Sequence, residues 1–84
     1  MEEWQVYDRI RDLKRRRTYV NKLLLQAELE LEKQLNVEIE SEDDLIRRDI
    51  KKAHLKWVKC WYEEIDLELK EKQQEYRELK NNKE

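Results

Sequence analysis

Apolar residues recur at steps of three and four along the first part of the chain. They are Val6, Ile10, Leu13, Val20, Leu24, Ala27 and Leu31, with Arg17 in the place of one further apolar residue. This spacing marks the a and d positions of a heptad repeat, the pattern of a helix that packs against another helix. Leu23 and Leu35 widen the apolar stripe beside this seam. The pattern predicts a first helix from about residue 3 to about residue 35.

A second heptad series occupies the C-terminal half and predicts a helix over about residues 42–80. Its members are Leu55, Val58, Tyr62, Ile65, Leu69, Tyr76 and Leu79, with Lys72 as an interruption. A further apolar stripe lies beside it and comprises Ile46, Ile50, Ala53, Trp57 and Trp61. A helix with one neighbour needs an apolar face only a little over ~100° wide. Here the apolar residues cover more than half of the circumference, so we expect the central part of this helix to have two neighbours.

The segment between the two series has the features of a loop followed by a helix start. Residues 36–40 alternate polar and β-branched side chains, which are poor helix formers. Ser41 then precedes three acidic residues, and this order predicts an N-cap at Ser41 with Asp44 as a short capping box. We therefore expect one domain over residues 1–84 with a loop at about residues 36–41, and fraying of residues 81–84.

The charge distribution distinguishes a hairpin from one continuous helix. Residues 1–22 carry a net charge of +3, residues 23–44 of −7, residues 45–62 of +5 and residues 63–84 of −3. Folding back near residue 39 places each block against its opposite, with the basic run Lys14–Arg17 facing Glu63, Glu64 and Asp66. Arg17 then lies opposite Trp61 and can stack on it or reach Glu64. The sequence predicts an all-α, coiled-coil-like antiparallel hairpin of two helices.

Composition argues against several functional classes. The chain has no Gly and no Pro, which argues against most β architectures and excludes glycine-rich phosphate loops. It has one Ser, one Thr, one His and one Cys. His54 and Cys60 are six residues apart, about 240° around a helix, and no zinc or di-iron spacing occurs. We therefore predict a non-enzymatic protein without catalytic, metal or cofactor residues, in which Cys60 is a buried or half-buried thiol.

The same inventory bears on the compartment. A single cysteine cannot form an intrachain disulfide, and the acidic N-terminus has no apolar signal-peptide region. The longest apolar run is Leu23–Leu25, far too short to span a membrane. We expect a cytoplasmic protein without a transmembrane segment.

A hairpin this small needs further support, because it has neither disulfide nor metal. We expect it to dimerise into an antiparallel four-helix bundle, or to bind a helical protein partner. The predicted interface residues are Tyr19, Leu23, Leu24, Ile50, His54, Trp57, Trp61 and Tyr62. The function predicted from this pattern is a protein–protein interaction or oligomerisation module that presents a charged helical surface to a protein partner.

An alternative function is the binding of a polyanion such as a nucleic acid. Two groups of basic residues support it: Lys14, Arg15, Arg16 and Arg17 in the first helix, and Arg48, Lys52, Lys56 and Lys59 in the second. Nucleic-acid-binding domains usually have a pI above ~9. The pI of about 5.6 therefore favours salt-bridged surfaces over this alternative. Residues 46–62 are also basic, amphipathic and rich in tryptophan, as in helices that bind a membrane surface or a calmodulin-like groove, but a folded hairpin would hide that face.

Overall fold

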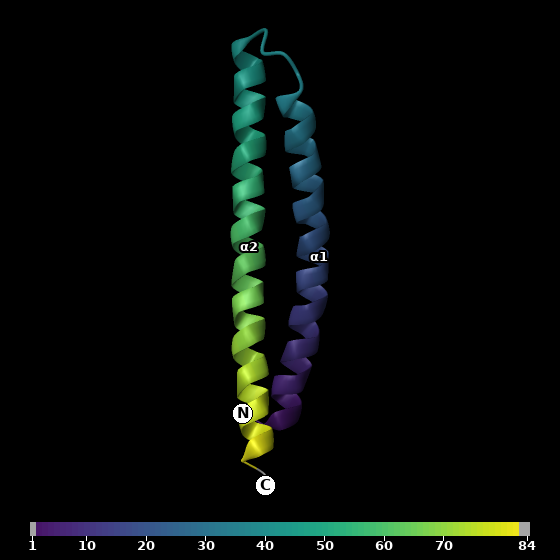
Figure 1. Ribbon diagram of the computed structural model, residues 1–84, viewed down its shortest axis with the longest axis vertical. Coiled ribbons are helices and arrows are strands. Elements are labelled where there is room, and N and C mark those ends of the chain that lie inside the picture. The colour runs from purple at the N-terminus through teal and green to yellow at the C-terminus, as the bar shows by residue number, and fades with distance from the viewer. Residues whose placement is uncertain (1, 83–84) are drawn as a thin grey trace.

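A computed structural model describes residues 2–82 and shows two long helices joined by a short loop. Helix α1 spans Glu3–Leu35 and helix α2 spans Glu42–Asn81. They run antiparallel and side by side along a rod of 67 × 14 × 14 Å, with the loop at one end and both termini at the other (Figure 1). The predicted all-α helical hairpin is confirmed. The predicted helix bounds agree with the structure to within one residue.

The core is a single row of apolar side chains between the two helices. The buried residues are Val6, Ile10, Leu13, Val20 and Ala27 of α1, and Val58, Ile65 and Leu69 of α2. All eight belong to the two predicted seams. Because burial of one such aliphatic side chain contributes about 1.5–3 kcal/mol, this row supplies most of the attraction between the helices.

Two charged residues that interrupt the seam reach outward to carboxylates. Arg17 is half-buried, and its Nη1 donates to Oδ1 of Asp66 at 3.2 Å. Lys72 pairs with Glu75 at 3.1 Å in the same way. The predicted reach of Arg17 to Glu64 is therefore wrong, because Asp66 lies directly beside the seam. Hydrogen bonds from Lys70 and then Arg17 lower the pKa of Asp66.

Ion pairs across the helices set their register. Arg9 donates from Nε and Nη2 to Glu68 over 2.7–3.1 Å, and Lys51 donates to Glu30 at 2.9 Å. The hydrogen bond from Lys51 lowers the pKa of Glu30. Both contacts join a basic residue to an acidic block of the other helix, as the charge pattern predicts. Such exposed pairs each contribute only about 0–1 kcal/mol, so they select the register more than they stabilise the fold.

The loop is held by contacts that differ in part from the predicted cap. Ser41 is the N-cap of α2, as predicted, but its hydroxyl makes no capping hydrogen bond. Instead, the backbone N–H of Glu40 donates to Oδ2 of Asp44 at 3.1 Å, and this bond lowers the pKa of Asp44. On the α1 side, Nη2 of Arg48 donates to the carbonyls of Leu35 and Val37 at 3.4 and 3.3 Å. Leu35 is the last residue of α1 and Val37 follows it in the loop, where the end of the helix leaves carbonyl acceptors without partners.

The other end of the hairpin joins the start of α1 to the end of α2. The backbone N–H of Glu2 donates to Oε1 of Gln5 at 2.9 Å, which caps the first turn of α1. The rings of Tyr7 and Tyr76 lie 6.0 Å apart, and Nζ of Lys80 lies 5.6 Å from the Tyr76 ring centre. Of the residues 81–84 predicted to fray, Asn81 is the last residue of α2 and Asn82 is its C-cap, whereas residues 83–84 lie outside the described residues.

Candidate interaction surface

One contact identifies which surfaces of the two helices adjoin. Arg9 precedes the seam residue Ile10, Glu68 precedes the seam residue Leu69, and the two side chains are bonded. The residues that directly precede seam residues therefore lie along one side of the hairpin on both helices. Leu23 of α1 and His54 and Trp61 of α2 occupy the same positions.

This side of the rod carries a group of six large side chains, apolar except for one histidine, which we call the aromatic face. It comprises Tyr19 and Leu23 of α1, and Ile50, His54, Trp57 and Trp61 of α2. Four of them are exposed, and Leu23 and Trp61 are half-buried. Tyr19, Ile50 and Trp57 lie one helical turn before Leu23, His54 and Trp61 and extend the face outward. Their exposed fractions are 59% for Tyr19, 60% for Ile50 and 61% for Trp57.

The aromatic rings of α2 lie close together along the helix, with His54 and Trp57 stacked and Trp57 and Trp61 tilted by 41°. The ring centres of His54 and Trp57 are 6.5 Å apart, and those of Trp57 and Trp61 are 5.4 Å apart. Trp57, Cys60, Trp61 and Glu64 line a shallow hollow at this point. Cys60 is exposed at its edge, so the prediction of a buried or half-buried thiol is wrong. The reason is that Cys60 lies on the outer side of α2, which only a second neighbour would cover.

The predicted interface residues divide into two groups. Tyr19, Leu23, Ile50, His54, Trp57 and Trp61 lie together on the aromatic face. Leu24 and Tyr62 instead occupy seam positions and are partly buried against the core of the hairpin. Leu23 and Trp61 of the aromatic face are also partly buried against this core, so the inner edge of the face helps to join α1 to α2.

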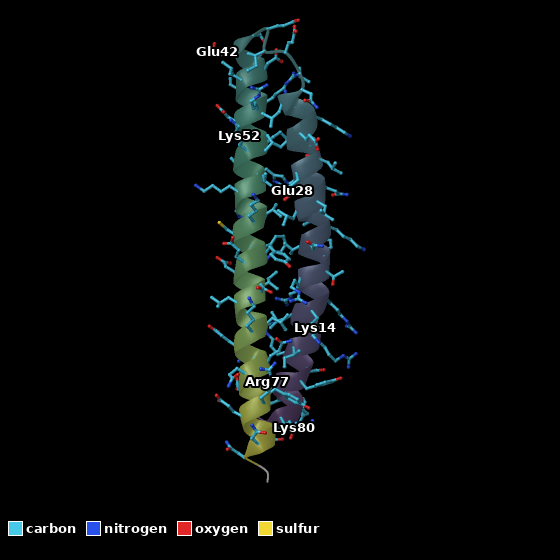
Figure 2. The ribbon with its side chains drawn as sticks, in the orientation of Figure 1. Lys14, Glu28, Glu42, Lys52, Arg77 and Lys80 are labelled. Carbon is cyan, nitrogen blue, oxygen red and sulfur yellow. The ribbon has the colours of Figure 1, made fainter. Side chains whose placement is uncertain are left out.

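Part of the predicted polyanion-binding set lies on the opposite side of the seam. Lys52 and Lys59 follow seam positions, and together with Lys56, Leu31 and Leu55 they line a shallow hollow that we call the lysine face. Lys14 also follows a seam residue and lies further along the same side. Figure 2 shows Lys52 near the loop end of α2 and Lys14 in the part of α1 nearer the termini, with Glu28 of α1 between them in height.

The remaining basic residues of that set are dispersed. Arg48 is half-buried at the loop, where it donates to backbone carbonyls. Arg16 pairs with Asp12 at 3.1 Å on the side of the aromatic face, and Arg15 is exposed on the outer surface of α1. Consecutive helix residues are separated by about 100°, so a run of adjacent basic residues spreads around the rod instead of forming one patch.

Four exposed aliphatic residues at the loop end were not singled out as candidates from the sequence. They are Leu35, Val37, Ile39 and Leu45, with exposed fractions of 42–49%. Only their position outside the heptad seams could have indicated this exposure.

Three further observations bear on function. Among residues 2–82, no group of three His, Cys, Asp or Glu side chains is arranged to hold a metal ion. Neither helix, over the same residues, has a stretch long and apolar enough to cross a membrane. No protein-family model, curated protein or solved structure matches the chain significantly. The inference of function therefore depends on the surfaces of the hairpin.

Proposed function

We propose that the protein is a non-enzymatic interaction module that self-associates through the aromatic face and presents its charged outer surfaces to a protein partner. The observation that carries this proposal is the grouping of six large side chains, three of them about 60% exposed, on one side of the rod. Contiguous exposed apolar surface of this kind marks protein–protein interfaces. Aromatic residues in particular supply the energetically dominant contacts at such interfaces.

The shape of the hairpin gives a second reason for association. Its accessible surface is 6843 Å². A compact monomer of the same mass, 10.6 kDa, exposes about 5,500 Å². The excess accessible surface arises because a two-helix rod buries only one row of side chains between its helices and encloses no larger core. Stacking a second hairpin on the aromatic face converts that face into the interior of a four-helix bundle.

Fluorescence quenching tests this function. In a Trp4→Phe variant, Trp57 and Trp61 are the only indoles, so acrylamide quenching reports on the aromatic face alone. We expect quenching to be weak at high protein concentration and to rise on dilution as the assembly dissociates. Equal quenching at all concentrations, at the level of an exposed indole, would contradict the proposed function.

The lysine face supports a second candidate, the binding of a polyanion. The residues that line its hollow include three lysines and no carboxylate. A gel-shift experiment with duplex DNA at about 50 and 200 mM salt tests it, because phosphate binding by several lysines weakens steeply over this range. Binding that is lost in a Lys52→Gln/Lys56→Gln/Lys59→Gln variant would support this candidate, and absence of any salt-sensitive shift would refute it.

The lone cysteine suggests a compartment for the module. Cys60 is an exposed free thiol beside the aromatic face. Oxidising compartments favour disulfides, whereas the cytoplasm keeps such thiols reduced. Cytoplasmic location is therefore part of the proposal.

A further inference from the structure

Four charged residues frame the aromatic face at its corners. Arg16 and Glu30 of α1 lie seven residues to either side of Leu23, and thus on the same side of that helix. On α2, Arg47 lies seven residues before His54, and Glu64 lies seven residues after Trp57. Arg16 and Glu64 mark the end of the face toward the termini, whereas Glu30 and Arg47 mark the end toward the loop.

The signs of these corners make the face complementary to itself. Each helix carries one positive and one negative corner, and so does each end of the face. A two-fold axis that lies in the plane of the face brings the faces of two copies together and exchanges either their two ends or their two helices. Every corner charge of one copy then lies over a corner charge of opposite sign on the other copy. Resting on the proposed function, we infer that the occupant of the aromatic face is a second copy of this chain, related by such a two-fold axis.

The apolar residues select the axis that runs across the helices. This axis stacks α2 on α2 of the second copy with opposite directions, so Ile50 of one chain meets Trp61 of the other and Trp57 meets His54. An axis along the rod would instead stack α2 on α1, where Ile50 would meet Gln26 and Trp61 would meet Arg16. The axis along the rod would still pair Tyr19 with Trp57 and Leu23 with His54. Only the antiparallel arrangement, with the loops at opposite ends, leaves neither Ile50 nor Trp61 facing a polar residue.

The charges beyond the face favour the same arrangement. From the face toward the C-terminus, the side of α2 that carries Trp57 and Trp61 continues as an acidic row: Glu64, Glu68, Glu71, Glu75 and Glu78. Antiparallel hairpins hold the two acidic rows at opposite ends of the dimer. Parallel hairpins would bring both rows to one end, where like charges repel.

The antiparallel overlap is large enough for a stable dimer. The midpoint between Ile50 and Trp61 lies six residues, or about 9 Å, from the middle of Glu42–Asn81. A two-fold axis there shifts the two 67 Å rods by about 18 Å and leaves about 49 Å of overlap. Two helices are about 20 Å wide, so each chain contributes about 1,000 Å², more than the ~800 Å² per partner of a typical stable interface.

Charge reversal at two corners tests the inference on the full chain. Arg47 and Glu64 are exposed, and neither forms an ion pair within the described part of the hairpin. In the antiparallel dimer they face each other twice, so Arg47→Glu should raise the dimer dissociation constant about tenfold at low salt. Adding Glu64→Arg restores the opposite signs and should return the constant to that of the unaltered chain. Sedimentation velocity over a concentration series measures all three proteins.

Taken together, the outcomes distinguish failure of the inference from failure of the proposed function. A monomeric unaltered chain would refute self-association and therefore both. A dimer that Arg47→Glu leaves unaffected would show that these corners are not at the interface. A dimer that the double variant weakens further than the single variant does would indicate parallel hairpins. In that arrangement the carboxylate introduced at position 47 faces Glu30, and the guanidinium introduced at position 64 faces Arg16. The control swap Lys56→Glu/Glu63→Lys reverses the same charges on the other side of α2 and should leave the dissociation constant unchanged. Circular dichroism of each variant checks that the helices persist.

Discussion

Replacement of Trp57 by Ala removes a large exposed ring of the aromatic face. Trp57 is 61% exposed and occupies no seam position, so the hairpin itself does not depend on its burial. The chain offers a matched control in Trp4, which is 63% exposed near the termini and away from the aromatic face. The pair of variants Trp57→Ala and Trp4→Ala therefore changes the same side chain with the same exposure at two locations.

The expected magnitude follows from the area that Trp57 can still bury. A tryptophan side chain presents about 150–250 Å². The 61% that remains exposed therefore amounts to about 90–150 Å². At about 25 cal/mol per Å², its loss costs about 3 kcal/mol per chain. The two-fold dimer contains two copies of the residue, so we expect the dissociation constant to rise at least about 100-fold even if half of this free energy is realised.

Sedimentation equilibrium with a thermal melt at the same concentration measures this effect. Trp57→Ala should sediment as a monomer at concentrations where the unaltered chain is a dimer, and its melting temperature should fall. Trp4→Ala should retain both mass and melting temperature. An unchanged mass and melting temperature for Trp57→Ala, or equal losses in both variants, would refute the assignment of the aromatic face as the interface.

Three further predictions concern the hairpin. Leu69→Ala should lower the free energy of unfolding by about 2–5 kcal/mol, because Leu69 is fully buried. Leu25 is 52% exposed, so Leu25→Ala should change this free energy by no more than about 0.5 kcal/mol. Urea unfolding of the two variants measures both changes. Asp44→Ala should lower the melting temperature more than Ser41→Ala, because only the Asp44 carboxylate bonds the Glu40 N–H; equal losses would contradict this. Glu30, Asp44 and Asp66 have lowered pKa values, so their contacts should stabilise the hairpin fully above the ordinary values of 4.5 and 3.8 and progressively less as the pH falls. The urea midpoint should therefore be lower at about pH 3 than at about pH 6, and a higher midpoint at pH 3 would refute the stabilising contacts of these carboxylates.

The fold could be predicted from the sequence because it depends on helical periodicity and charge alone. Every buried residue lies at a position that the three- and four-residue steps identify, and the alternating charge blocks are sufficient to indicate an antiparallel hairpin. The helix bounds could be predicted from the weak helix formers at residues 36–40 and from the acidic first turn of α2. The periodicity and the helix ends are local signals, and the charge signal compares whole blocks of the sequence, so none of them required knowledge of the path of the loop.

Details that depend on side-chain reach were not predictable in this way. Arg17 pairs with Asp66 and not with Glu64, and Arg48 contacts loop carbonyls instead of forming part of a basic row. Both outcomes depend on which nearby acceptor the folded backbone brings closest. The exposure of Cys60 has a different origin, since the apolar stripe beside it lacks its second neighbour in a single hairpin.

The central claim is that the aromatic face is covered by a second copy of the chain. Size-exclusion chromatography with light scattering, over a range of concentrations, measures mass directly against the 10.6 kDa of one chain. We predict about twice that mass, retained on dilution until the dissociation constant is reached. A mass of one chain at every concentration would contradict the claim and would leave the aromatic face as the binding site of a different protein.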